Sequence, residues 1–411
     1  MTASDKITLF EDKEKCCGCG GCYNVCPQGA ISMKQDEFGF LYPQIDHDKC
    51  ISCGLCKSVC AFQNTQETNT PVAAYAAVNR DREQLFYAAS GGLFTALAEK
   101  ILSEGGAVFG CAMDIHGGKI TVHHVMADKK EDLKRLQGSK YVQSDTEKTF
   151  SETMTLLEDG RKVLYSGTPC QIAALKEFLK KDYDNLILVD IICHGVPGVK
   201  MLQGYLDLEK EKRGYKEITG YLFRDKKAGW GENSGLYGID KKGREAVYRR
   251  PARLSSYYAL FLDGLISRKN CYSCKYACEK RPGDITVGDF WGIAYEHPDI
   301  LKKGGAFVED AGISCLIANT EKGRDFCEDG SLNIEKVPST FEKIAKGNVH
   351  LNRPYEYTPK RDRVMELYLS EGYAGVEKLY MKAYKKQRLI HFVFNKLPRS
   401  LRNKIKKYRL N

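Results

Sequence analysis

Two groups of cysteines near the N-terminus have a spacing that could hold iron–sulfur clusters. In each group the cysteines are separated by two, two and three residues, and they are Cys16, Cys19, Cys22 and Cys26, then Cys50, Cys53, Cys56 and Cys60. In paired motifs of this kind, three thiolates of one group and the fourth thiolate of the other group bind each [4Fe–4S] cluster. The predicted ligand sets are therefore Cys16, Cys19, Cys22 and Cys60 for one cluster, and Cys50, Cys53, Cys56 and Cys26 for the other.

Structural zinc and a disulfide framework are the alternative interpretations of these groups. Zinc sites typically combine two CxxC pairs and lack both the third cysteine and the Cys-Pro step that Cys26 and Pro27 form here. One departure from the usual pattern is Ala61, which follows Cys60 where a proline is common, but this change removes no ligand. Cys17 lies outside the spacing, so no ligand role is predicted for it.

A third group of cysteines lies much further along the chain, in the stretch CYSCKYAC. Cys271 and Cys274 form a CxxC pair, which is half of a metal site and needs partners. Cys170 and Cys193 are candidates because each follows a predicted strand, and strand ends at one edge of a sheet can converge. Cys278 competes with Cys170 for the fourth position. These residues predict a third metal site, and a CxxC pair by itself leaves structural zinc open beside iron–sulfur.

The elements that must position these residues begin at residue 72, where the hydrophobic pattern becomes that of an α/β domain. Helical spacing predicts helices over 93–102 and 169–180, and GAVFGCAM and ITVHHVMA flank DIHGGK as a hairpin would. Short apolar strands are expected at 162–167 and 185–193 and in the stretches DITVGDFWG and ISCLIAN. Strands that alternate with helices are typical of a largely parallel or mixed sheet. The fold class is therefore α/β, with the cysteine-rich unit in front as a small α+β domain.

Two loops of this domain have features of phosphate-binding turns. In AASGGLFTAL, Ser90 is an expected N-cap and Gly91 and Gly92 add little bulk; in SGTPCQ, Gly167 precedes the expected cap Thr168. Free N–H groups and the helix dipole favour an anion at such a helix N-terminus. Ordinary capped helices are the alternative, and the sequence has no GxGxxG fingerprint of the usual dinucleotide fold.

The formal net charge of +10 comes from the C-terminal end of the chain. Residues 378–411 contain twelve Lys or Arg and no acidic residue, so 51 basic residues (63 minus 12) stand against 53 acidic ones in residues 1–377. A nearly neutral body argues against nucleic acid as a partner. Apolar positions at helical spacing from Val376 to Leu397 predict a helix that packs on the domain, or that docks to an anionic membrane surface or an acidic partner such as ferredoxin.

The seventeen cysteines favour metal binding or redox chemistry over disulfides, because the N-terminus lacks the features of a secretory signal. No apolar run approaches the ~18–20 residues that a membrane span needs. We therefore expect a cytoplasmic protein whose basic tail could bring it to the inner membrane surface. Cys111, Cys315 and Cys327 lie in apolar segments and are expected to be buried core thiols.

Five motifs in the same order, SGGLFTAL, GSKYVQS, SGTPCQIAALK, IICHG and CYSC…DITVGDFWG, resemble the coenzyme F420 hydrogenase/dehydrogenase beta-subunit family. The resemblance includes the N-terminal dicluster unit that many members carry. It implies a flavoprotein that binds FAD and passes electrons between iron–sulfur clusters and a soluble redox coenzyme. Cysteines recur in this family at the positions of Cys170, Cys193, Cys271 and Cys274, which favours a third [4Fe–4S] cluster there.

The resemblance also implies which residues would hold FAD. Ser90, Gly91 and Gly92 would approach its phosphates, and the flavin would be lined by Lys140, Tyr141, Gly288, Asp289 and Phe290, with Gly167 and Thr168 in the second loop. A positive charge at Lys140 would stabilise a reduced, anionic flavin. A solvated surface lysine is the alternative. No acid–base residue is identified.

Together these features predict four segments: a dicluster [4Fe–4S] ferredoxin domain over 1–63, a linker over 64–71, an FAD-binding mixed-sheet α/β domain over 72–350, and a basic helical tail over 351–411. The expected function is that of an iron–sulfur flavoprotein oxidoreductase with two-electron transfer to or from F420 or another small acceptor. One alternative is a non-catalytic electron-transfer subunit of a larger hydrogenase or dehydrogenase complex. Another is a ferredoxin-dependent reductase of a different small substrate, for example one related to envelope polysaccharides.

Overall fold

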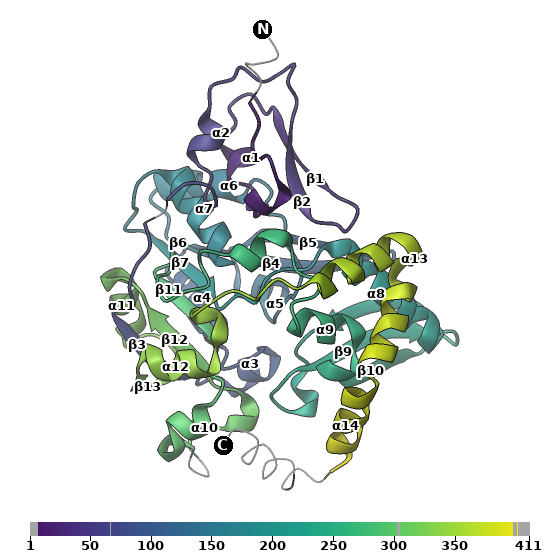
Figure 1. The fold of residues 1–411 in the computed structure, drawn as a ribbon. Coiled ribbons are helices and arrows are strands. Elements are labelled where there is room, and N and C mark those ends of the chain that lie inside the picture. The colour runs from purple at the N-terminus through teal and green to yellow at the C-terminus, as the bar shows by residue number, and fades with distance from the viewer. Residues whose placement is uncertain (1–6, 66, 302–304, 398–400, 402–411) are drawn as a thin grey trace.

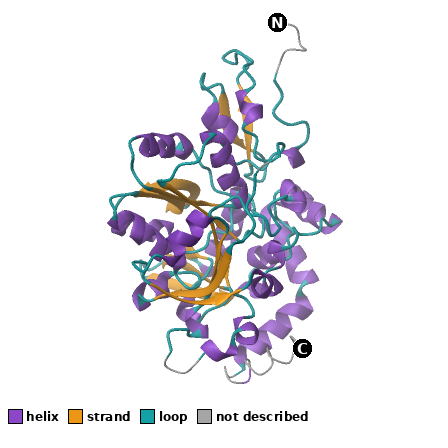
Figure 2. Ribbon diagram, turned by 90° about the vertical axis from the view of Figure 1, so that its left-hand side faces the viewer, coloured by secondary structure: helices purple, strands orange, loops and turns teal. Residues whose placement is uncertain are grey.

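The computed structural model describes residues 7–65, 67–301, 305–397 and 401 (Figure 1). A small cysteine-rich unit lies at one end of the molecule, and a large twisted sheet flanked by helices forms the body (Figure 2). Within these described residues, no helix is long and apolar enough to cross a membrane.

The N-terminal unit is α+β, as predicted. Its elements are a 3-10 turn η2 (Lys13–Lys15), α1 (Gly21–Val25), β1 (Ile31–Gln35), β2 (Leu41–Ile45) and α2 (Leu55–Ser58). The two strands pair antiparallel between the cysteine groups. Gly20 and Gly54 precede the two helices with φ angles of 81° and 77°, a left-handed conformation that glycine adopts without strain. The same turn therefore recurs in both cysteine groups.

The body contains an eight-stranded mixed sheet, as the alternation of strands and helices predicts. Its spatial order is β13 (Ile334–Ser339), β3 (Ala73–Asn79), β12 (Ser314–Ala318), β11 (Ile285–Asp289), β7 (Leu186–Ile191), β6 (Val163–Gly167), β4 (Ala107–His116) and β5 (Lys119–Ala127). The four strands β11, β7, β6 and β4 are parallel to one another, and the outer strands join them antiparallel. The loops that follow β6, β7 and β11 therefore meet at one edge of the sheet.

The helices surround this sheet. They are α3 (Arg82–Tyr87), α4 (Leu93–Ser103), α5 (Leu133–Leu136), α6 (Thr149–Glu158), α7 (Pro169–Leu179), α8 (Val199–Arg213), α9 (Ser256–Leu262), α10 (Ile293–Glu296), α11 (Glu321–Glu328), α12 (Phe341–Gly347), α13 (Pro359–Ala383) and α14 (Lys385–Lys396). A second, antiparallel sheet of β8 (Tyr215–Leu222), β9 (Asn233–Asp240) and β10 (Glu245–Pro251) lies beside α13 and α14 (Figure 1).

The predicted elements of the body are confirmed, with bounds shifted by up to three residues. The hairpin of β4 and β5 is closed by Gly117 and Gly118, whose positive φ angles suit a two-residue turn between His116 and Lys119. β7 is buried along Leu186–Asp190, which fits a central parallel strand covered on both faces.

Other elements were not expected from the sequence. β3 and β13, and the whole of the second sheet, had no clear alternation. Ala76 and Ala77 of β3 are completely buried and pair with β12 on one side and β13 on the other. Tertiary pairing thus overrides the helical preference of alanine here. In the predicted linker, Asn69 exchanges two backbone hydrogen bonds with Arg281, of 2.8 and 2.9 Å, so this segment is joined to the body.

The C-terminal helix predicted from Val376 to Leu397 is two helices. α13 ends at Ala383 and α14 begins at Lys385, and between them the Tyr384 hydroxyl donates to an Asp263 carboxylate oxygen at 2.5 Å. α13 packs on α8 and α9 through buried side chains, namely Val364, Met365, Tyr373 and Val376. The basic residues at 398–400 and 402–411 fall outside the described part of the chain.

Candidate functional site

Two cavities in the N-terminal unit separate the cysteines into the two sets that the spacing predicts. The first cavity is lined by Cys16, Cys19, Cys22 and Cys60, together with Cys17 and Cys56. The second cavity is lined by Cys26, Cys50, Cys53 and Cys56. Cys60 has left its own group for the first cavity and Cys26 its own group for the second. This exchange matches the ligand crossing of two-cluster ferredoxins.

A third cavity lies where the N-terminal unit meets the body. Its cysteines are Cys170, Cys193, Cys271 and Cys274, with Cys17 on the same wall. Cys278 is not among the described residues that line this cavity. Its sulfur instead contacts the carbonyl oxygens of Lys275 and Lys280, each at 3.3 Å. The structure therefore gathers the predicted set with Cys170, not Cys278, as its fourth member.

The donor chemistry of the three cavities fits iron–sulfur clusters. Each cavity presents at least four cysteine sulfurs and no described carboxylate, and a [4Fe–4S] cluster takes four thiolates. Over the described part of the chain, no group of three or more His, Cys, Asp or Glu is close enough to hold a single metal ion. The ligands of a cluster each bind a different iron and stand further apart than the ligands of one ion.

Secondary structure fixes the cysteines of the third cavity. Cys170 is the second residue of α7, whose N-cap Thr168 donates its backbone N–H to the side-chain oxygen of Gln171 at 3.0 Å. The predicted cap is thus confirmed, and Pro169 is the first residue of the helix. Cys193 follows β7, and Cys271 lies in the 3-10 turn η6 (Lys269–Ser273).

A buried ion pair holds the late cysteine loop against β7. Asp190 and Arg281 have side chains that are at most 1 % exposed, and Arg281 Nη2 lies 2.7 Å from Asp190 Oδ1. The other Arg281 nitrogen, Nη1, donates to the carbonyl of Tyr276 at 2.7 Å. Asp190 is the one charged residue in the apolar run LILVDII of this strand. An acidic residue at that position could have indicated a buried cationic partner.

Burial sets the protonation of most of these thiols. It raises the pKa of Cys16 and Cys274 to about 11 and that of Cys271 to about 12. Cys170 differs, because the neighbouring Cys17 thiol lowers its pKa. A cluster needs thiolates, so its binding releases protons from the buried thiols.

A fourth, larger cavity opens at the carboxyl ends of the parallel strands and has a volume of about 290 Å³. This is close to the lower end of the roughly 300–1,000 Å³ found for ligand pockets. Its lining includes most of the residues predicted to hold FAD: Ser90, Gly92, Lys140, Tyr141, Gly167, Thr168, Gly288 and Asp289. Gly91 and Phe290 are predicted residues that do not belong to the described lining.

The SGG turn differs from its prediction. The N-cap of α4 is Gly92, with φ of 72°, and not Ser90. Ser90 instead donates its hydroxyl to the carbonyl of Ile313 at 3.0 Å, and the Gly91 N–H donates to the Ser314 hydroxyl at 2.8 Å. A Cβ at Gly91 would lie 2.6 Å from the Ala77 carbonyl, so packing against β3 and β12 requires this glycine. Phe290 is completely buried in the core.

Lys140 and Tyr141 both line the large cavity. The Lys140 ammonium donates to the carbonyls that end α5, those of Arg135, Leu136 and Gln137, at 2.8–3.1 Å. Burial lowers the pKa of Lys140 to about 8, so it is not a solvated surface lysine. The Tyr141 ring stacks on Phe261 with centroids 4.8 Å apart.

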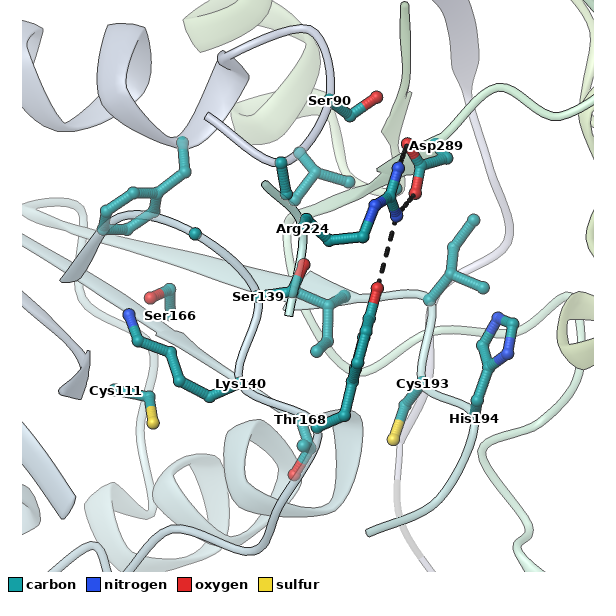
Figure 3. Close-up of a pocket in the computed structure, with 18 of the residues that line it drawn as sticks. Ser90, Cys111, Ser139, Lys140, Ser166, Thr168, Cys193, His194, Arg224 and Asp289 are labelled. Atoms are coloured by element: carbon teal, nitrogen blue, oxygen red, sulfur yellow. Dashed lines mark hydrogen bonds and ion pairs between the residues drawn. The ribbon is translucent and has the colours of Figure 1, made fainter. Parts of the chain in front are cut away.

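An arginine that sequence reasoning missed organises the far wall of this cavity (Figure 3). Arg224 pairs with both oxygens of Asp289, at 2.7 and 3.1 Å, and donates to the Tyr141 hydroxyl at 3.2 Å. Trp230 donates its indole N–H to Asp289 at 2.9 Å and stacks on Trp291. Burial raises the pKa of Asp289, but the Arg224 charge and hydrogen bonds outweigh it and hold that pKa below its usual value.

The remaining cysteines divide between core and cavity. Cys315 and Cys327 are buried core thiols as expected. Cys111 of β4 packs against the core but is only partly buried, because it also lines the large cavity near Lys140 (Figure 3).

Neighbouring cavities share side chains. Cys56 lines both the second and the first cavity, and Cys17 lines both the first and the third. Thr168, Cys193 and His194 line both the third and the large cavity. The four cavities therefore form one continuous series from the N-terminal unit to the large cavity.

Comparison with known proteins gives matches to two family models. Residues 160–339 match the model for the C-terminal part of the coenzyme F420 hydrogenase/dehydrogenase beta subunit, and residues 15–64 match the 4Fe-4S dicluster domain. The chain is 47 % identical over 36 residues to an uncharacterized ferredoxin of Methanocaldococcus jannaschii, which covers 9 % of this chain and 47 % of the ferredoxin. The chain thus spans about half the length of that curated relative. A chain in a structure of the F420-reducing [NiFe] hydrogenase complex from Methanosarcina barkeri aligns with a TM-score of 0.39 and 17 % identity, covering 74 % of this chain and 96 % of that one.

Proposed function

This chain belongs to the coenzyme F420 hydrogenase/dehydrogenase beta-subunit family and carries a 4Fe-4S dicluster domain, and from this premise we propose that it is an iron–sulfur flavoprotein oxidoreductase. In this proposal, three [4Fe–4S] clusters occupy the three cysteine-lined cavities and FAD occupies the large cavity. Bound there, the clusters would supply one-electron transfer and the flavin two-electron transfer. The electron partner is a soluble redox coenzyme such as F420, or another small acceptor.

The observation that carries this proposal is the sharing of cavity walls. Cys17, Cys56 and Cys193 each lie on a boundary, so every cavity adjoins the next without an intervening layer of core. An isolated structural zinc clip would have no need to adjoin a ligand cavity. The arrangement favours a third cluster on Cys170, Cys193, Cys271 and Cys274.

Several features of the large cavity suit FAD. Thr168 lies at the N-terminus of α7, where free N–H groups and the helix dipole attract a phosphate. Tyr141 and Trp291 offer aromatic surface, and Arg224 offers a buried cation held in place by Asp289. The residues proposed to bind FAD are Ser90, Gly92, Lys140, Tyr141, Gly167, Thr168, Gly288 and Asp289. Gly91 supports the turn that carries Ser90.

Turnover by the isolated chain tests the proposal. The protein would be prepared anaerobically with iron, sulfide and FAD, and oxidation of reduced F420 would be followed with ferredoxin or a viologen as electron acceptor. We expect turnover with reduced F420. Turnover only with reduced ferredoxin and a different small acceptor would identify a ferredoxin-dependent reductase of another substrate. Reducible cofactors without turnover in any of these assays would identify a non-catalytic subunit of a larger hydrogenase or dehydrogenase complex.

We also propose that α14 docks the protein on an anionic membrane surface. Its apolar residues Leu389, Phe392 and Val393 are 63 %, 50 % and 51 % exposed. Lys385, Lys386 and Lys396 on the same helix are exposed as well. The twelve Lys or Arg of residues 378–411, with no acidic residue among them, match an anionic surface.

A further inference from the structure

Cys17 stands apart from the other cysteines of the N-terminal unit. The first cavity already has its four predicted ligands, and the third cavity has another four, yet Cys17 lines both. Its side chain is 7 % exposed and packs in one hydrophobic cluster with Cys19, Cys170 and Cys274. A cluster takes four thiolates, so Cys17 is surplus to both sites.

Cys17 lies between cysteines of both parts of the fold. It packs in one buried cluster with Cys19, a predicted ligand of the first cluster, and Cys170, a predicted ligand of the third. Since Cys19 comes from the N-terminal unit and Cys170 from α7, this one thiol bridges the two parts of the fold. Two other side chains of the body also hydrogen-bond to the N-terminal unit. The Thr146 hydroxyl donates to the carbonyl of Cys19, and the Tyr276 hydroxyl donates to the carbonyl of Ala61.

We propose that Cys17 is a positioning residue and not a ligand: its S–H group donates to a ligand sulfur of the first and of the third cluster and raises the reduction potential of both. This inference rests on the third cluster of the proposed function. A hydrogen bond to a cluster sulfur withdraws negative charge and favours the reduced, more negative state. Because a thiol has one proton, it bonds more strongly to whichever of the two sulfurs carries more charge. One donor thereby serves both neighbouring sites.

Redox titration of the anaerobically reconstituted full chain, followed by electron paramagnetic resonance, tests this role. Cys17→Ala removes the donor and Cys17→Ser keeps a hydroxyl donor in its place. Cys327→Ala is the matched control, since Cys327 is also a buried cysteine but lies in α11. We expect Cys17→Ala to retain the iron content of the unmodified protein while the signals of two clusters shift to lower potential and that of the second cluster stays. Cys17→Ser should lie close to the unmodified protein, as should Cys327→Ala.

Two results would overturn the inference. Loss of about four irons in Cys17→Ala would make Cys17 a ligand, and unchanged potentials in Cys17→Ala would remove its tuning role while leaving the proposed function intact. An unmodified protein that binds only about eight irons would instead refute the third cluster itself, and this inference with it. Iron content measured beside the potentials thus separates failure of the inference from failure of the proposed function.

Discussion

At the scale of single residues, the late cysteines show how little spacing alone decides. From the sequence, Cys170 and Cys278 compete for one ligand position, and Cys278 is the closer of the two in sequence to Cys271 and Cys274. The fold separates them, because α7 directs Cys170 into the third cavity while Cys278 turns toward the carbonyls of Lys275 and Lys280. Convergence of strand ends could be expected beforehand, but spacing alone left the choice between the two sulfurs open, and only the family resemblance favoured Cys170.

Iron analysis of two serine variants checks this assignment. Cys170→Ser should lose about four irons per chain, because a cluster that lacks one of four thiolates is weakly held. Cys278→Ser, a matched change of a cysteine to serine beside the same cavity, should retain the full iron content. The reverse pattern would assign Cys278 to the third site.

The ion pair between Arg224 and Asp289 was not predicted from the sequence. Asp289 was predicted from a motif, but its partner lies on a loop after β8 that no motif marked. Arg224→Met leaves a buried carboxylate without its cation, so we expect a loss of about 3–5 kcal/mol in the free energy of unfolding. The control Arg244→Met breaks an exposed pair with Asp240 and should cost about 0–1 kcal/mol. Equal losses in chemical denaturation would contradict the importance of the buried pair.

The pH dependence of this pair has a definite sign. Arg224 holds the folded pKa of Asp289 below the ordinary carboxyl value of about 3.9. The stabilisation is therefore complete above that ordinary value and is lost only as the pH falls through the lower, folded pKa. The difference in unfolding free energy between the unmodified protein and Asp289→Asn should stay constant between about pH 6 and 8. A difference that declines across this range would show that Asp289 titrates there.

At the scale of elements, the parallel strands explain why motifs far apart in sequence meet. Gly167 ends β6, Cys193 lies two residues after β7, and Gly288 is the last residue but one of β11. Parallel neighbours bring the carboxyl ends of these strands to one edge. The hydrophobic pattern was sufficient to predict these three strands. It failed for β3, where alanines fill a crowded centre, and for the second sheet, whose strands alternate poorly.

The C-terminal helices were predicted correctly in type but not in number, since the one predicted helix is two. Helical spacing was right but did not reveal the break at Tyr384, whose hydroxyl donates to Asp263, a residue far away in sequence. The break matters because it leaves α14 a separate helix after α13 has packed on the body. Two side chains that follow at helical spacing, Leu389 and Val393, then remain exposed.

Vesicle sedimentation tests the membrane role of α14. The full chain should sediment with vesicles of phosphatidylcholine and phosphatidylglycerol, less with phosphatidylcholine alone, and less again at high salt, because salt screens the attraction. The double variant Leu389→Gln and Val393→Gln should bind more weakly, whereas Leu222→Gln, which alters an exposed leucine of β8, should not. Binding that is unaffected by lipid charge or by the double variant would refute the proposal. Retention on an acidic ferredoxin column without vesicle binding would point to a protein partner instead.

At the scale of the whole molecule, we propose that the four cavities form a continuous series of redox sites. Buried residues of the N-terminal unit join the hydrophobic clusters of the body, and the third cavity lies at the junction of the two parts, with Cys17 from one and Cys170 from the other. No local motif encodes such a junction, because Cys17, Cys56 and Cys193 come to shared walls only through the fold.

The most direct test of this claim is the iron, zinc and flavin content of one anaerobic preparation of the full chain. We expect about twelve irons and one FAD per chain, which correspond to three four-iron clusters and a flavin. About eight irons with one zinc would make the third site a structural zinc site and would limit the iron–sulfur clusters to the N-terminal unit. A folded protein without flavin would contradict the flavoprotein assignment and leave an iron–sulfur electron carrier.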